Sequence, residues 1–169
     1  MRIMSNSKRF RIEPATPNDV ALVLRFIKGL AEYEGLSDEV VATEDDLRKS
    51  LFGPEPDAEA VFAYHDTEPV GFAVFCRRYS TYLGSPILYL EDIFVLSEWR
   101  GSGVGRELMA YGAGLAKARG YPMMSWSVLD WNEPAIRFYE NLGARKAQGW
   151  STYHLSGDAL ERLASPDSP

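Results

Sequence analysis

The residues with the clearest chemical pattern form a glycine-rich turn between an apolar stretch and a helical pattern. Shortly after the apolar run that ends at Val95 come Arg100-Gly101-Ser102-Gly103-Val104-Gly105-Arg106. The first N–H groups of a helix have no partner within it and lie at the positive end of its dipole. Glycines let the backbone approach an anion closely. A strand, a glycine-rich turn and a helix in this order indicate a diphosphate site.

Three kinds of phosphate loop, and a purely structural turn, compete for this pattern. A P-loop closes on Gly-Lys-Ser/Thr, which Gly105-Arg106-Glu107 lacks. A dinucleotide fingerprint needs a glycine where Arg106 stands. The spacing Arg100-x-x-Gly103-x-Gly105 instead matches the Arg/Gln-x-x-Gly-x-Gly/Ala loop of the GNAT N-acetyltransferases.

Two acids, Glu91 and Asp92, interrupt the apolar stretch from Ile87 to Val95. A strand so apolar is expected to be central and covered on both faces. A carboxylate there is costly unless partnered, and its pKa is expected to rise. Neighbours on a strand point to opposite faces unless a bulge intervenes, so the two acids need not share one role. Acids that cap nearby N–H groups at a strand end are the alternative.

Tyr139 follows Asn132 by seven residues, nearly two helical turns, so both are predicted on one helix face. A tyrosine there could protonate a leaving thiolate, or it could be a core residue like its neighbour Phe138. The acids from Glu32 to Asp46 form a dense run, either a solvated face or a rim that attracts cations. For Cys76, His65 and His154, packing or surface roles are expected.

Composition limits the class of protein. The 169 residues carry a net charge of −6, which argues against nucleic acid as the main partner. One Cys excludes an intramolecular disulfide, and one Cys with two His does not make a usual zinc site, so no metal is expected. With no run of 18 apolar residues and no signal segment, we expect a cytoplasmic protein without a membrane partner.

Periodicity predicts a mixed α/β protein, with a single domain over residues 10–164 between a flexible tail (1–9) and a short tail (165–169). Strands are expected at 10–12, 60–64, 70–79, 87–95, 123–129 and 150–155. Helices are expected after Thr16 to about 34, after Thr43 to about 52, from 104 to about 119, from Asn132 to about 142, and in a short last segment capped by Asp158.

Taken together, several ordered motifs resemble the diamine (spermidine/spermine) and thialysine acetyltransferases of the GNAT superfamily, from about Phe10 to Ala164. They are the 89–95 stretch YLEDIFV, the loop from Arg100, the 131–134 stretch WNEP, and Phe138-Tyr139 with Gly143-Ala144, extended by 30–34 (LAEYE) and Gly149-Trp150. The resemblance implies a mixed, mostly antiparallel twisted sheet with helices on both faces, and a V-shaped opening beside the central strand.

The resemblance also implies roles. Acetyl-CoA would lie in the opening, in contact with Asn132, with the backbone of Ile93, Phe94 and Val95, and with the loop of Arg100, Gly101, Ser102, Gly103, Val104, Gly105 and Arg106. Tyr139 would be the general acid near the cofactor sulfur, and Glu91 would orient the amine or accept its proton through water. Tyr33, Glu34 and Asp92 would line the amine side, with Ser125, Trp126 and Ser127 facing the acceptor. Family members are usually homodimers.

Departures from the family pattern keep other functions open. Gln148 stands where relatives have an acid before the Gly-Trp pair, and Glu140 and Asn141 replace basic residues. The first weakens the case for a polyamine with a second cationic anchor. The 33–38 and 128–131 stretches are slightly closer to the thialysine branch. The alternatives are a protein-lysine or peptide N-acetyltransferase, a non-catalytic acyl-CoA sensor, and a small nucleotide-binding domain.

Overall fold

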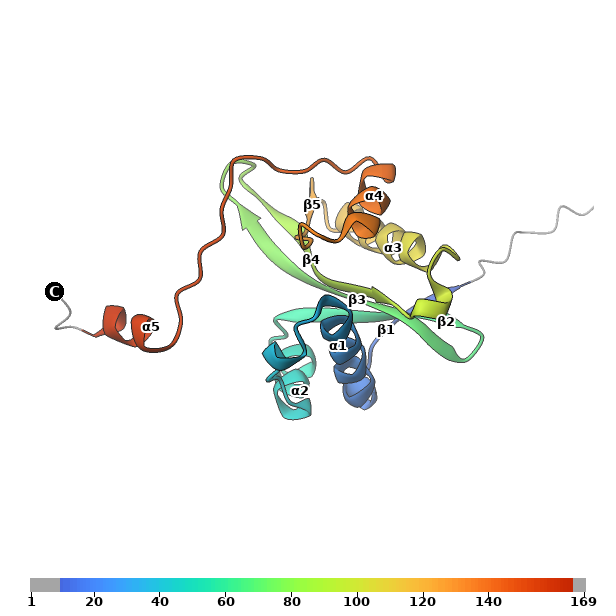
Figure 1. Cartoon of the computed structure of the whole chain (residues 1–169), viewed down its shortest axis with the longest axis horizontal. Coiled ribbons are helices and arrows are strands. Elements are labelled where there is room, and N and C mark those ends of the chain that lie inside the picture. The colour runs from blue at the N-terminus through green and yellow to red at the C-terminus, as the bar shows by residue number, and fades with distance from the viewer. Residues whose placement is uncertain (1–9, 166–169) are drawn as a thin grey trace, which may run out of the picture. The chain divides into compact units, whose positions relative to one another are not determined.

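A computed structural model describes residues 10–165, and its central feature is a five-stranded sheet in the order β1-β2-β3-β4-β5 (Figure 1). The first three pairings are antiparallel, and only β4 with β5 is parallel. The strands are β1 (Arg11–Pro14), β2 (Ala58–His65), β3 (Glu68–Ser80), β4 (Ser85–Val95) and β5 (Met124–Ser125). The predicted mixed, mostly antiparallel sheet is confirmed, and the apolar 87–95 stretch lies between two neighbouring strands.

The helices that follow Thr43 and Asn132 begin where their capping signals predict. The helices are α1 (Val20–Glu34), α2 (Glu44–Phe52), α3 (Val104–Ala118), α4 (Glu133–Asn141) and α5 (Gly157–Ala164), with 3₁₀ turns η1 (Pro17–Asp19), η2 (Ser37–Glu39) and η3 (Ser97–Trp99). Before α2, the Thr43 N–H donates to Asp46 Oδ2 at 2.9 Å, and the Asp46 N–H donates to Thr43 Oγ1 at 3.2 Å. This reciprocal pair fixes the start of α2. The N-cap of α5 is Ser156, not Asp158, which lies in the first turn.

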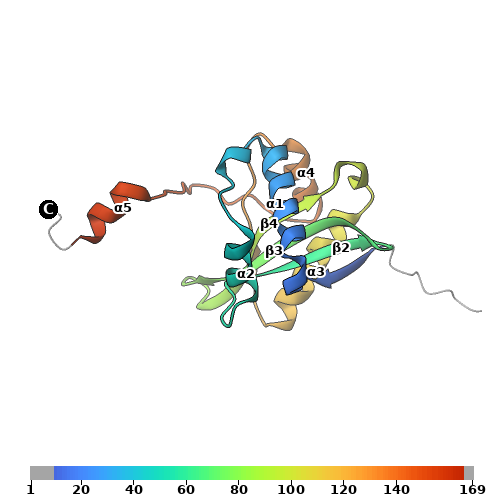
Figure 2. The ribbon, with the colours of Figure 1, turned by 90° about the horizontal axis from the view of Figure 1, so that it is seen from below.

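Helices α1 and α2 cover one face of the sheet and α3 covers the other (Figures 1 and 2). On the α1 face, Phe26 packs against Phe62 and Phe72, with ring centroids 5.6 and 5.3 Å apart. On the α3 face a Cβ on Gly71 would lie 2.9 Å from Val104, so only glycine lets α3 approach β3 this closely. These two cores hold β4 between helices on both sides.

One predicted strand is absent and another is shorter than expected. The 150–155 segment, predicted as a strand, makes no strand pairing with residues 10–165, and Trp150 and Tyr153 are exposed. Its Trp, Thr and Tyr residues have a high propensity for strands, but propensity alone supplies no partner edge. The strand predicted over 123–129 is limited to Met124 and Ser125, because its pairing with β4 ends there.

The chain forms two compact units, one ending at Ser127 and one beginning at Val128. A single domain over 10–164 therefore stays a prediction. The predicted flexible tail (1–9) and all but Ser165 of the predicted end tail lie outside the described residues. Within residues 10–165, no helix combines the length and apolarity needed to cross a membrane, and no cluster of His, Cys, Asp and Glu is arranged to hold a metal.

Candidate active site

Among residues 10–165, the edge of β4 next to β5 has no strand partner over its second half. Pairing with β5 covers only Leu88 and Tyr89, whereas β4 continues to Val95. On the other edge, the Leu96 N–H donates to the Val70 carbonyl at 3.0 Å. Because hydrogen bonding alternates along an antiparallel pair, the backbone groups of Ile93 and Val95 point away from β3. They face the side where β5 has ended, and the V-shaped opening expected beside this strand stays a prediction.

The glycine-rich loop joins this open edge to α3. Gly101 and Gly103 have φ of 74° and 102°, a region that favours glycine. The Ser102 hydroxyl donates to the Trp99 carbonyl, which ties the loop to η3. The Val104 side chain is buried in the α3 core, so only its backbone is available to a ligand. The unpaired N–H groups at the start of α3 follow at once, as a diphosphate site requires.

A β-bulge separates the two acids of the central strand. Val74 pairs with Asp92 and Phe75 pairs with Leu90, so Glu91 is the extra residue in β4. Glu91 is exposed, whereas Asp92 is partly buried. Asp92 shares a face with Phe94, which packs against Gly29 of α1. The bulge therefore gives the neighbouring acids different environments.

Asp92 lies among other carboxylates. Burial, followed by the charges of Glu91 and Glu34, raises the pKa of Asp92 to about 6. Burial also raises the pKa of Glu34, at the end of α1. The charges of Glu34 on α1 and Glu91 on β4 therefore both act on Asp92, and the predicted amine-binding role of these acids stays a prediction. Such a group of like charges favours a cationic ligand, because a cation relieves their repulsion.

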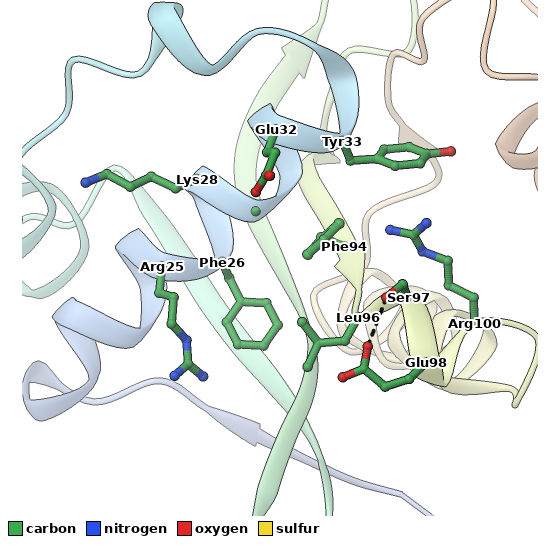
Figure 3. A pocket seen from close by; sticks show the side chains of 11 residues that line it. Arg25, Phe26, Lys28, Glu32, Tyr33, Phe94, Leu96, Ser97, Glu98 and Arg100 are labelled. Carbon is green, nitrogen blue, oxygen red and sulfur yellow. Dashed lines mark hydrogen bonds between the residues drawn. The ribbon is translucent and has the colours of Figure 1, made fainter.

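An open pocket of about 720 Å³ lies between α1 and the end of β4 (Figure 3). The Arg100 guanidinium lies 4.4 Å from the centroid of the Tyr33 ring and 5.6 Å from that of Phe94. Arg100 Nε also donates to the Val95 carbonyl at 3.1 Å. The structure thus joins Tyr33, predicted on the amine side, with Arg100, predicted on the cofactor side. The remaining lining residues are Arg25, Phe26, Lys28, Gly29, Glu32, Leu96, Ser97 and Glu98.

The predicted acceptor strand contacts the sheet at its start, beside Leu88 and Tyr89. Ser125 pairs with Tyr89, and the Ser127 and Tyr89 hydroxyls are 3.1 Å apart. Ser125 and Trp126 are partly buried, and Ser127 is exposed. These residues therefore follow the point where β4 and β5 part.

The second unit holds the other two predicted site residues on one helix. The Asn132 side chain accepts from the Ala135 N–H at 3.3 Å and caps α4, as predicted. Asn132 and Tyr139 are both buried, with 6% and 8% of their surface exposed. The Tyr139 and Phe138 ring centroids are 5.3 Å apart. The chemical role of each stays a prediction.

Two features of the site were missed from the sequence. The only sign of the bulge at Glu91 in the sequence is a polar pair that interrupts an apolar strand. That sign does not show which of the two residues is the extra one. The contact between Arg100 and Tyr33 has no signal in the sequence. The two residues are 67 positions apart, and their contact depends on how α1 crosses β4.

The sequence model of the Acetyltransferase (GNAT) family matches residues 28–144, which include the end of α1, the strands β2 to β5, the loop and α4. The chain belongs to this family. It is an acetyltransferase, and the resemblance inferred from its motifs is confirmed.

Curated relatives agree with the family of this acetyltransferase. It is 38% identical to thialysine N-epsilon-acetyltransferase of Sus scrofa in an alignment 164 residues long that covers 90% of this chain and 96% of that protein. It is 29% identical to L-ornithine N5-acetyltransferase of Arabidopsis thaliana, covering 90% and 87% of the two chains.

Solved structures agree with the fold of this acetyltransferase. An integron cassette protein from V. cholerae superposes with a TM-score of 0.74 at 27% identity, covering 92% of this chain and 98% of that one. An aminoglycoside acetyltransferase from an uncultured soil sample gives 0.74 at 17% identity, covering 89% and 99%, a likeness of fold alone.

Proposed function

We propose that this acetyltransferase moves an acetyl group from acetyl-CoA to a primary amine of a small cationic acceptor, a thialysine- or lysine-like amino acid or a diamine. The observation that carries the proposal is the group of Glu34, Glu91 and Asp92 beside the open edge of β4. The names of the thialysine, ornithine and polyamine acetyltransferases among its relatives support an amine acceptor.

The open edge and the loop fit acetyl-CoA. The outward backbone groups of Ile93 and Val95 can pair with the amides of the pantetheine arm, although Arg100 Nε already uses the Val95 carbonyl. The N–H groups from Gly101 to Arg106 can hold the pyrophosphate at the start of α3. Asn132 is assigned to the cofactor by the family resemblance. The thioester supplies an acyl group already activated for attack by an amine.

Asp92 is the proposed proton acceptor, with Glu34 orienting the amine and Glu91 orienting it or taking its proton through water. A primary amine with a pKa near 10.4 costs about 4.6 kcal/mol to present as the neutral form at pH 7. A carboxylate takes its proton more readily as the two pKa values approach each other. Raising the pKa of Asp92 from 3.8 to about 6 narrows that gap by about 2 units. Glu91, exposed on the bulge, contacts solvent and suits transfer through water.

Tyr139 is the proposed proton donor to the departing thiolate. Its phenol is the acid of α4 in the family motif, and the Asn132 cap together with Pro134 fixes the start of that helix. A positioned general acid contributes about 10²–10⁴-fold to the rate.

We further propose that the enzyme is a homodimer, as the family resemblance implies, and that it acts in the cytoplasm. Apolar side chains such as Trp150, Tyr153 and Leu163 are exposed, and exposed apolar patches are common at protein interfaces. Light scattering across a range of concentrations tests the dimer, and a mass of one chain throughout would reject it.

The test of the function is release of free thiol from acetyl-CoA with thialysine, lysine, ornithine, putrescine, spermidine and a lysine peptide. Turnover of a small amine is expected. Turnover of the peptide alone would make this a peptide N-acetyltransferase. If all acceptors are inert while calorimetry shows coenzyme A binding, the chain is an acyl-CoA sensor and the proposed reaction is wrong.

A further inference from the structure

We propose that His65 is a positioning residue for the binding of acetyl-CoA. Its ring, at the end of β2, holds Trp99 in place, and Trp99 in turn holds the loop of residues 100–106, the cofactor loop. The inference deepens the proposed function and rests on its assignment of this loop to the pyrophosphate. It gives the hairpin between β2 and β3 a part in cofactor affinity.

Three rings pack together beside the start of the cofactor loop. The ring centroids of His65 and Trp99 are 4.5 Å apart, with 40° between the ring planes. The Phe10 centroid lies 6.0 Å from that of Trp99 and 5.9 Å from that of His65. Phe10 is buried, and the other two residues are partly buried. Each ring therefore lies within the range of both others at which aromatic pairs attract.

The backbone of Trp99 fixes the next part of the chain. Its carbonyl accepts from the Ser102 N–H at 3.3 Å and also from the Ser102 hydroxyl, and its own N–H donates to the Leu96 carbonyl at 2.9 Å. Glycines lie on both sides of Ser102, and a Cβ added at Gly101 or Gly103 would meet no atom of residues 10–165 within 4 Å. With open space at both glycines, the position of Ser102 depends on its bonds to Trp99.

The cofactor loop has two further anchors, which differ in kind from the contact with His65. At its far end, the Val104 side chain is buried in the α3 core close to Gly71. At its start, the Arg100 guanidinium stacks on Tyr33 of α1, and Arg100 is also assigned to the cofactor. The His65 side chain is instead 34% exposed. Its contact with Trp99 can therefore be weakened without changing either helix-facing core or a proposed ligand of the cofactor.

A loop that is held less firmly binds its ligand less tightly. When only a fraction of the molecules has the loop in the binding geometry, the apparent Kd rises by the inverse of that fraction. Loss of one aromatic contact corresponds to about a 3- to 10-fold change. Once acetyl-CoA is bound, the loop is in place and the chemical step is unaffected. His65 should therefore influence cofactor affinity and not the rate of the saturated enzyme.

The experiment measures coenzyme A binding by calorimetry, and steady-state rates, in the wild type, His65→Ala and His65→Phe. His65→Ala should raise the Kd for coenzyme A and the KM for acetyl-CoA by about 3- to 10-fold. Its kcat and its KM for the amine should stay within about 2-fold of wild type. His65→Phe keeps a flat ring beside Trp99 and should restore wild-type affinity.

Asp66→Asn is the matched control for the charge of the histidine. Asp66 Oδ2 lies 3.8 Å from His65 Nδ1, and Asp66 has a φ of 54°, which asparagine tolerates. The substitution therefore removes the ion pair and keeps the turn. Asp66→Asn should bind coenzyme A as the wild type does. A Kd raised as much as in His65→Ala would assign the effect to charge and overturn the inference.

Hydrogen exchange of the free protein tests the loop without any turnover. In His65→Ala the amides of residues 100–106 should exchange about 3- to 10-fold faster than in wild type, whereas those of α2 should not change. Saturation with coenzyme A should remove the difference. Unchanged exchange in the loop together with an unchanged Kd would overturn the inference and leave the proposed function standing.

Tryptophan fluorescence makes the test independent of how His65→Ala folds. Coenzyme A should change the emission of the wild type, and Trp99→Phe should lose most of that change while it binds coenzyme A within about 3-fold of wild type. The chain has four tryptophans, so a full change in Trp99→Phe would assign the signal elsewhere and overturn the inference. A loss of affinity in His65→Ala that His65→Phe does not restore would also overturn it. No binding of coenzyme A to the wild type would overturn both this inference and the proposed function.

Discussion

Protonation of Asp92 is expected to produce a break in the pH dependence of kcat/KM. In the wild type, kcat/KM should fall more steeply below about pH 6, where the Asp92 carboxylate takes up a proton. Asp92→Asn should remove this break and lower kcat/KM by about 10²–10⁴-fold. Glu91→Gln should keep the break and move it to lower pH, because the Glu91 charge helps raise the pKa of Asp92. A break unchanged in Asp92→Asn would assign the proton to another group.

The same residue also links stability to pH. The pKa of Asp92 is higher in the folded chain, so between about pH 4 and pH 6 the folded state binds more protons than the unfolded state. Stability therefore falls as pH rises through this window. Asp92→Asn should be more stable than wild type above pH 7, by about 1–3 kcal/mol, and lose this advantage toward pH 4. Urea unfolding at pH 4 and pH 8 measures the difference, and equal gains at both pH values would contradict it.

Tyr139→Phe tests the proton donor. Removing the phenolic hydroxyl should lower kcat by about 10²–10⁴-fold and leave the affinity for coenzyme A within about 3-fold. Phe138→Leu is the matched control on the same helix, and it should affect stability more than kcat. A Tyr139→Phe enzyme with wild-type turnover would remove Tyr139 from the mechanism.

At the scale of single elements, two glycine-to-alanine substitutions test the start of α3. One lies just before the helix and the other lies inside it. Gly103 has a φ of 102°, so Gly103→Ala should cost about 1–2 kcal/mol of stability and weaken coenzyme A binding. Gly114 lies inside α3 with open space around it, so Gly114→Ala should stabilise by about 0.5–1 kcal/mol. Thermal unfolding and calorimetry measure both effects. A loss of affinity in Gly114→Ala would show that the helix as a whole, not its first turn, controls binding.

The elements could be predicted where the signal is local. The Thr43 and Asp46 pair before α2 and the Asn132 cap of α4 form within a few residues, so their sequence determines them. The segment from Trp150 to Leu155 was predicted as a strand and is not one, because a strand also needs an edge from elsewhere. The bulge at Glu91 and the contact of Arg100 with Tyr33 were not predictable for the same reason: each depends on how two elements meet.

At the scale of the whole molecule, charge should govern acceptor capture. Exposed acids cluster from Glu32 to Asp46, on α1, η2 and the start of α2, in a chain with a net charge of −6. Such a field concentrates cations and is screened by salt, with a Debye length of about 10 Å at 0.1 M. The KM for a cationic amine should rise about 3- to 10-fold between 20 mM and 500 mM salt. The KM for anionic acetyl-CoA should not rise in parallel, and a parallel rise would point to a general salt effect.

The bulge also makes Glu91 unusual as a place to shorten the chain. Losing any other residue of β4 would shift the alternation of the strand and exchange its two faces. Leu90 pairs with Phe75 on the α3 face, and Asp92 pairs with Val74 on the α1 face. If Glu91 were deleted, Leu90 and Asp92 would become true neighbours on a regular strand, and both cores would keep their side chains. An in-frame deletion of Glu91, natural or engineered, can therefore remove its carboxylate without a change in either core.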